Sequence, residues 1–225
     1  MKRSVKRSVN RSMKRTTIKA VKLENLVSEV KAVCEKKQKR REAVLRLKPL
    51  DTAPDIKAAM RSLLQHQHRI AFVGIGNELK GDDGAGPLFV KTLEEHIWML
   101  PPVEKEKLIE RVGYINSGTA PENITGFLKR FSPSLVAFVD AADIGMEPGS
   151  IGLFAPEELG NSPLSTHTLP LKIIVEYLKE EMDAEFVILG IQPYSTEPMI
   201  EISPFVKDSV GVVCEVIMEV LREDA

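Results

Sequence analysis

Several acidic residues and one histidine could do chemistry, because each lies where a predicted strand gives way to a loop. Asp82 and Asp83 follow one short apolar run, and Asp140 closes another. His167 lies in the polar loop SPLSTHTLP, which precedes a predicted helix. A carboxylate at the end of a buried apolar strand is costly unless it is paired or functional. Two carboxylates and an imidazole from separate strand ends suit a divalent metal ion of intermediate softness.

The same residues also have purely structural interpretations, which the sequence leaves open. An aspartate at a helix N-terminus interacts favourably with the helix dipole, so one of Asp82 and Asp83 could serve only to stabilise the helix that follows. A single histidine in a loop, such as His167, is usually a surface residue. Asp143 lies three residues beyond Asp140 and is expected to belong to a turn.

The glycine-rich segment GIGNELKGDDGAG (74–86) follows the first predicted strand of the sheet. It lacks the G-x-G-x-x-G spacing of dinucleotide-binding loops and the Gly-Lys-Ser/Thr ending of a phosphate-binding loop. Its adjacent carboxylates would also repel a phosphate. The glycines at 76, 81, 84 and 86 permit tight turns or the close approach of another backbone. HExxH and GxSxG motifs are absent from the chain, so nucleotide binding and two common hydrolase mechanisms find no support.

Strands and helices are predicted to alternate from residue 69 onward. Apolar runs predict strands over 69–76, 108–116, 134–143, 150–156 and 185–193. Helical periodicity predicts helices over 56–66, 85–100, 119–131, 170–182 and 204–221. Thr119 and Glu122 have the spacing of a capping box for the third of these helices. This order predicts a three-layer αβα sandwich, with a mostly parallel, twisted sheet flanked by helices on both faces. In such sheets the functional site lies at the carboxyl ends of the strands.

The N-terminal part of the chain differs from the rest in composition. Residues 1–22 contain nine of the 31 Lys and Arg residues and no acidic residue, and residues 2–17 form a degenerate four-residue repeat. We expect a disordered basic tail that contacts an acidic partner, nucleic acid or an anionic membrane, or that is simply solvated. Residues 23–68 are expected to form a helical extension or linker, and residues 69–225 the α/β domain.

The cysteine count and the hydropathy pattern indicate a cytoplasmic location. Cys34 and Cys214 are the only cysteines and lie far apart, so neither a disulfide framework nor a cysteine-based metal site is expected. No apolar run approaches 18 residues, and we therefore expect no transmembrane span.

Four segments in the same order resemble the hydrogenase maturation endopeptidases: GIGNELKGDDGAG, VDAADIG (139–145), STHTLPL (165–171) and GIQPYSTEP (190–198). The resemblance covers residues 69–222, and the long basic N-terminus departs from it. It implies a peptidase, generally monomeric, that removes a short C-terminal peptide from the nickel-loaded large-subunit precursor of a NiFe hydrogenase.

The resemblance also implies roles for individual residues. Asp83, Asp140 and His167 would contact a nickel ion that arrives within the substrate, and no nucleotide or organic cofactor is implied. Asp83 and Asp140 would be the catalytic acids, in either a metal-assisted or an aspartic-type mechanism. Asn77, Thr119 and Gln192 lie at or near the ends of three of the predicted strands and are expected to contact the substrate.

Two other classes of function remain open at this point. A non-catalytic maturation chaperone could use the same acids to bind nickel or the precursor. A small-molecule hydrolase is the third possibility, although the absence of phosphate-binding motifs counts against it.

Overall fold

The structure is a computed structural model that describes residues 53–156 and 168–224. Its sheet has the order β2-β1-β3-β5-β4. The strands are β1 (Ile70–Ile75), β2 (Val112–Gly118), β3 (Leu135–Ala141), β4 (Ile151–Phe154) and β5 (Glu185–Ile191). The first four strands in this order run parallel, and β4 pairs antiparallel with β5 at one edge.

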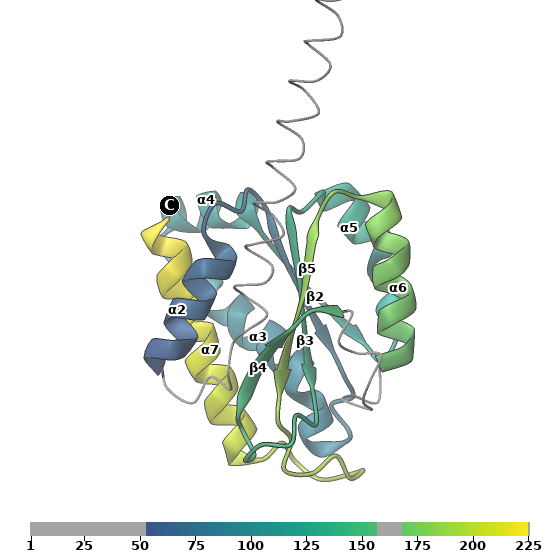
Figure 1. Ribbon diagram of the computed structural model, residues 1–225. Coiled ribbons are helices and arrows are strands. Elements are labelled where there is room, and N and C mark those ends of the chain that lie inside the picture. Colours follow the sequence, from purple (N-terminus) through teal and green to yellow (C-terminus); the bar gives the residue numbers. More distant parts are fainter. Residues whose placement is uncertain (1–52, 157–167, 225) are drawn as a thin grey trace, which may run out of the picture. The chain divides into compact units, whose positions relative to one another are not determined.

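Helices cover both faces of the sheet (Figure 1). The helices are α2 (Ala53–Leu64), α3 (Ala85–Trp98), α4 (Pro102–Arg111), α5 (Thr125–Phe131), α6 (Thr168–Glu181) and α7 (Pro204–Glu223). One core contains residues of α2, α3, α4 and α7, and the other contains residues of α5 and α6. Successive side chains of β1 alternate between them, because Phe72 packs in the first core and Val73 in the second. The predicted three-layer, mostly parallel α/β fold is therefore confirmed.

The prediction of a strand over 108–116 was wrong in its first half. Residues up to Arg111 belong to α4, and β2 begins at Val112. Pro101 precedes α4 and Pro102 occupies its first turn, where the fixed φ of proline favours a helix start. Leu108 is the buried residue of this highly charged helix. The apolar side chain of Leu108 therefore reflects the packing of a helix and not the formation of a strand.

The predicted capping box at Thr119 does not form. The 3-10 turn Pro121–Ile124 precedes α5, its N-cap residue is Ala120, and no side chain caps it. Thr119 is exposed. Ala120 has no side-chain oxygen that could accept from the first amides of the turn, so the turn begins without a side-chain cap.

Helix α2 is part of the core, although the predicted domain boundary at residue 69 would exclude it. Ile56, Met60 and Leu64 are buried in the same core as the apolar face of α7. Lys57 and Arg61 form ion pairs with Glu223 of α7. The described core therefore begins within α2. The predicted basic tail and most of the predicted extension, up to residue 52, lie outside the described residues.

We expect Met60→Ala to lower the free energy of unfolding by about 2–5 kcal/mol, because it leaves a cavity where a fully buried side chain packs between α2 and α7. Urea unfolding followed by circular dichroism measures the change. Ser62→Ala alters an exposed position of the same helix and should change stability by no more than about 0.5 kcal/mol. Equal stability of the two variants would show that α2 is not part of the cooperative fold.

Among the residues that the structure describes, no helix combines the length and the apolar character that crossing a membrane requires.

Candidate active site

Asp83 and Asp140 lie at the carboxyl ends of two neighbouring parallel strands. Asp140 is the penultimate residue of β3, and Asp83 lies in the 3-10 turn Gly81–Gly84 that follows β1. This turn contacts β3. Both carboxylates are buried, with exposed fractions of 3% for Asp83 and 1% for Asp140. The structure therefore brings the two predicted catalytic acids to one end of the sheet, where α/β proteins place their sites.

The glycine-rich segment sets the position of Asp83 through two close backbone approaches. Gly76 has a φ of +136°, and an added Cβ there would lie 1.8 Å from the carbonyl oxygen of Asp83. The amide of Asn77 donates to that carbonyl oxygen and to Oδ2 of the Asp83 side chain, at 3.1 Å each. At Gly86, an added Cβ would lie 2.3 Å from the carbonyl oxygens of Ile75 and Val139. The first turn of α3 therefore packs directly on the ends of β1 and β3.

Asp82 has a structural role that differs from the predicted stabilisation of the helix that follows, because no side chain caps α3. Its carboxylate accepts hydrogen bonds from the amides of Tyr194, Ser195 and Ser203, at 2.7, 3.2 and 2.6 Å. The Ser203 hydroxyl adds a fourth bond at 2.9 Å. These partners lie more than a hundred residues further along the chain, so the sequence pattern gave no signal for them.

The predicted substrate contacts differ in how they are placed. Oδ1 of Asn77 accepts from the Leu79 amide at 3.0 Å and so forms a local turn. Thr119 is exposed just beyond β2. Gln192 is buried, and its side chain makes four hydrogen bonds to other described residues; its contact with substrate stays a prediction. Asp143 accepts from the Gly145 amide at 3.2 Å, as expected for a turn residue.

His167 lies outside the described residues, so the predicted three-residue metal set remains a prediction. Within residues 53–156 and 168–224, no group of three or more His, Cys, Asp or Glu side chains has a metal-binding arrangement. Asp82, Asp83 and Asp140 nevertheless place three buried carboxylates at this end of the sheet.

Cys214 is not a candidate nucleophile. It is buried in α7, and its thiol contacts the carbonyl oxygen of Phe89 at 3.7 Å. Burial, reinforced by the nearby charge of Glu215, raises the pKa of the Cys214 thiol far above its usual range. The thiol therefore stays protonated and unreactive at neutral pH.

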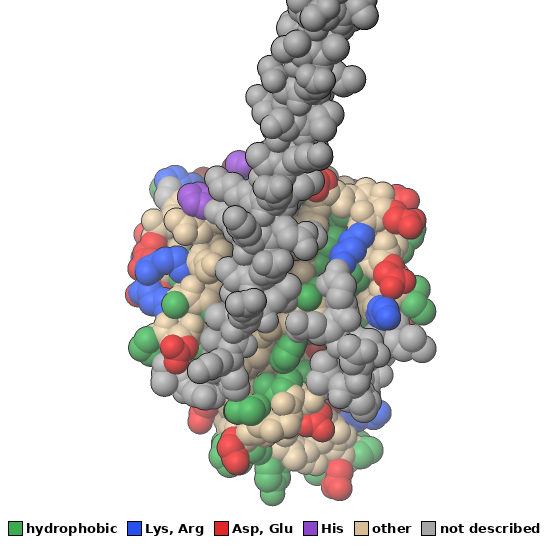
Figure 2. Space-filling model, in the orientation of Figure 1, with side chains coloured by type: hydrophobic (Ala, Val, Ile, Leu, Met, Phe, Trp, Pro, Cys, Tyr) green, Lys and Arg blue, Asp and Glu red, His purple; other side chains and the backbone are tan. Residues whose placement is uncertain are grey.

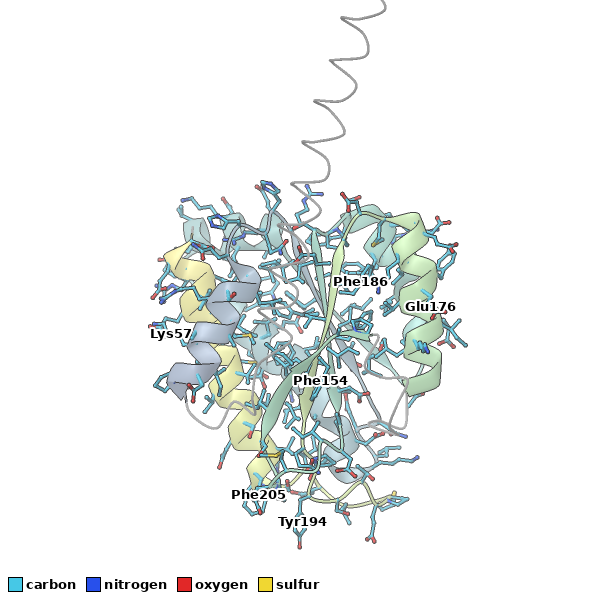
Figure 3. The ribbon with its side chains drawn as sticks, in the orientation of Figure 1. Lys57, Phe154, Glu176, Phe186, Tyr194 and Phe205 are labelled. Atoms are coloured by element: carbon cyan, nitrogen blue, oxygen red, sulfur yellow. The ribbon has the colours of Figure 1, made fainter. Side chains whose placement is uncertain are left out.

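The loops around the two acids expose apolar side chains. Leu79, Tyr194, Met199 and Ile200 are exposed on the segments that follow β1 and β5. Tyr194 and Phe205 lie together at this end of the molecule, with ring centroids 6.0 Å apart (Figure 3). Hydrophobic and acidic side chains gather there on the surface (Figure 2). Such a surface is suited to a polypeptide substrate.

Comparison with known proteins gives consistent matches. Residues 102–220 match the family model HycI, hydrogenase maturation protease. A Methanocaldococcus jannaschii protein named as a hydrogenase maturation protease is 37% identical over 169 residues, which are 75% of this chain and 97% of that protein.

Two solved structures share the fold. The crystal structure of the NiFe hydrogenase maturation protease HycI from Thermococcus kodakarensis has a TM-score of 0.63 and 34% identity, and the match covers 72% of this chain and 98% of that one. The solution structure of the Escherichia coli endopeptidase HycI has a TM-score of 0.54 and 28% identity, over 65% and 87% of the two chains. The chain therefore belongs to the hydrogenase maturation protease family.

Proposed function

We propose that this chain is an endopeptidase that removes a short C-terminal peptide from the nickel-loaded large-subunit precursor of a NiFe hydrogenase. One observation carries the proposal: Asp83 and Asp140 are buried at the adjacent ends of β1 and β3 in a chain of this family. The exposed apolar side chains around them supply a surface on which a polypeptide can lie.

The residue types fit the chemistry of peptide hydrolysis. The reaction needs a polarised carbonyl group and an activated water, and a divalent ion can supply both. In this proposal the nickel belongs to the substrate, where precursor cysteines hold it. Asp83, Asp140 and His167 contact it from the protease side and orient the scissile bond. Asp83 also serves as general base for the water.

An aspartic-type reaction would use the same two carboxylates without the ion. In that case Asp83 and Asp140 share a proton, one activating the water and the other donating to the carbonyl group. The two mechanisms predict different responses to the nickel content of the precursor.

The proposal is tested by incubating the protein with nickel-loaded and nickel-free precursor and measuring the precursor mass. We expect the loaded precursor to lose a C-terminal peptide and the nickel-free precursor to remain intact. Cleavage of both forms at similar rates would favour the aspartic-type reaction. Tight binding without a change in mass would instead support the maturation chaperone, and absence of interaction would favour a small-molecule hydrolase.

A metal analysis of the isolated protein complements this test. If nickel arrives with the substrate, the purified protein should contain far less than one equivalent of tightly bound metal, because three protein ligands leave an ion open to solvent and to chelators. Elemental analysis after dialysis against a chelator measures this. One retained ion per chain would contradict the assignment of the metal to the substrate.

A further inference from the structure

The segment between β5 and α7, residues 192–203, contacts both of the chain segments that carry the candidate acids. We call it the brace loop. It begins at Gln192, directly after β5, and ends at Ser203, the N-cap residue of α7. Two buried polar side chains that the proposed chemistry does not use, Asp82 and Gln192, hold it in place.

Asp82 binds both ends of the brace loop through one carboxylate. Oδ2 accepts from the Tyr194 and Ser195 amides near the start of the loop, and Oδ1 accepts from the Ser203 amide at its end. The Ser203 hydroxyl completes the set. Hydrogen bonds to an ionised acceptor are roughly twice as strong as those between neutral groups. The brace loop is therefore fastened to the residue that immediately precedes Asp83.

Backbone hydrogen bonds extend this attachment along the chain. The Asp82 amide donates to the Ser195 carbonyl oxygen at 2.9 Å, and the Gly81 amide donates to the Ile200 carbonyl oxygen at 3.2 Å. In the other direction, the Met199 amide donates to the Leu79 carbonyl oxygen at 2.8 Å. The turn that contains Asp83 is thus held by hydrogen bonds to the brace loop as well as by its contacts with the sheet.

Gln192 makes the equivalent attachment on the side of Asp140. Its Oε1 accepts from the amides of Ile144 and Met146, at 2.8 and 3.3 Å. Its Nε2 donates to Oδ1 of Asp143 at 3.3 Å. These residues form the loop that leaves β3 just after Asp140. The side-chain amide therefore uses its hydrogen-bonding capacity to fix the exit of that strand.

From these contacts we infer that Asp82 and Gln192 are positioning residues, and that the brace loop sets the relative position of Asp83 and Asp140. Each side chain fastens the same loop to the segment that bears one acid. The consequence for catalysis rests on the proposed peptidase function, whereas the mechanical coupling rests on the hydrogen bonds alone. A displacement of reacting groups by about 1 Å can lower a rate about a hundredfold.

Asp82→Asn is the first test. An amide cannot accept from all four donors, because its NH2 group must face either the Ser203 amide or those of Tyr194 and Ser195. We expect the cleavage rate constant of bound precursor to fall about a hundredfold, with the KM for precursor changed less than about threefold. Asp208→Asn makes the same change from carboxylate to amide at an exposed position of α7 and should leave both values unchanged.

Gln192→Glu is the second test. It keeps an acceptor for the Ile144 and Met146 amides but places a carboxylate oxygen against Oδ1 of Asp143. The same pattern is expected, a fall in the cleavage rate constant at nearly constant KM. If either variant raised KM at an unchanged rate constant, that residue would contact substrate, and the positioning role would be overturned.

Amide hydrogen exchange tests the coupling without any cleavage assay. In Asp82→Asn the backbone amides at positions 81, 82 and 199 should exchange with solvent at least about tenfold faster. Such an increase corresponds to a tenfold larger equilibrium constant for local opening. In Gln192→Glu the amides of Ile144 and Met146 should show the same increase. If the wild-type protein cleaves no precursor, the proposed function fails. The exchange rates alone then test whether Asp82 and Gln192 hold the brace loop in place. Unchanged exchange at these amides in both variants overturns the inference even when the wild-type protein is active.

Discussion

Replacing Asp83 by asparagine is expected to lower the rate of precursor cleavage by about 10²–10⁴-fold, the range for loss of a general base. The substitution keeps the shape of the side chain and leaves an oxygen that can accept from the Asn77 amide, which donates to Asp83 at 3.1 Å. It removes the negative charge on which both proposed mechanisms depend. The rate is measured by mass spectrometry of nickel-loaded precursor over time.

Asp140→Asn should give a loss of similar size, because Asp140 is the second proposed catalytic carboxylate and is buried at the same end of the sheet. Asp208→Asn is the matched control, since Asp208 is exposed on α7. It should cleave at the wild-type rate. All three variants should retain the native circular dichroism spectrum. Near-normal cleavage by a folded Asp83 or Asp140 variant would remove that residue from the site.

Gly86→Ala is expected to destabilise the fold strongly. The added Cβ would lie 2.3 Å from the carbonyl oxygens of Ile75 and Val139 and 2.5 Å from the Ile75 amide nitrogen. These are main-chain atoms of two buried strands and cannot rotate away. Overpacking a core costs typically 1–3 kcal/mol, and occasionally more; we expect the upper end of this range, or failure to fold, in urea unfolding.

Gly211→Ala is the control for this change, because it makes the same substitution within a helix. An added Cβ at Gly211 of α7 meets no atom within 4 Å. Alanine favours the helical backbone over glycine by roughly 0.5–1 kcal/mol, so this variant should be slightly more stable than the wild-type protein. Equal stability of the two variants would mean that α3 does not pack on β1 and β3 as closely as the structure shows.

The central strands could be predicted from the sequence because each is buried on both faces. β1, β3 and β5 are apolar runs bounded by polar or glycine residues, and the structure places them within two residues of the predicted limits. The location of Asp83 and Asp140 followed from the same pattern, since residues directly after parallel strands share one end of a sheet.

Other features depend on contacts that no local pattern contains. Helix α4 is highly charged and buries Leu108 alone, so its apolar signal is too weak to show a period. The amphipathic pattern of α2 is visible, but only the structure shows that α7 covers it. Asp82 and Gln192 have their roles through partners 112 and 48 residues away in the sequence, respectively.

The pairing of α2 with α7 has a consequence for the order in which the chain can fold during synthesis. The ion pair between Lys57 and Glu219 joins residues 162 positions apart. At about 5–20 residues per second, a ribosome needs roughly 10–30 s to proceed from the end of α2 to α7. During that time the apolar face of α2 lacks its native partner in the nascent chain. The first described helix can therefore dock only after the last one has left the ribosome, which makes α7 the element that completes folding.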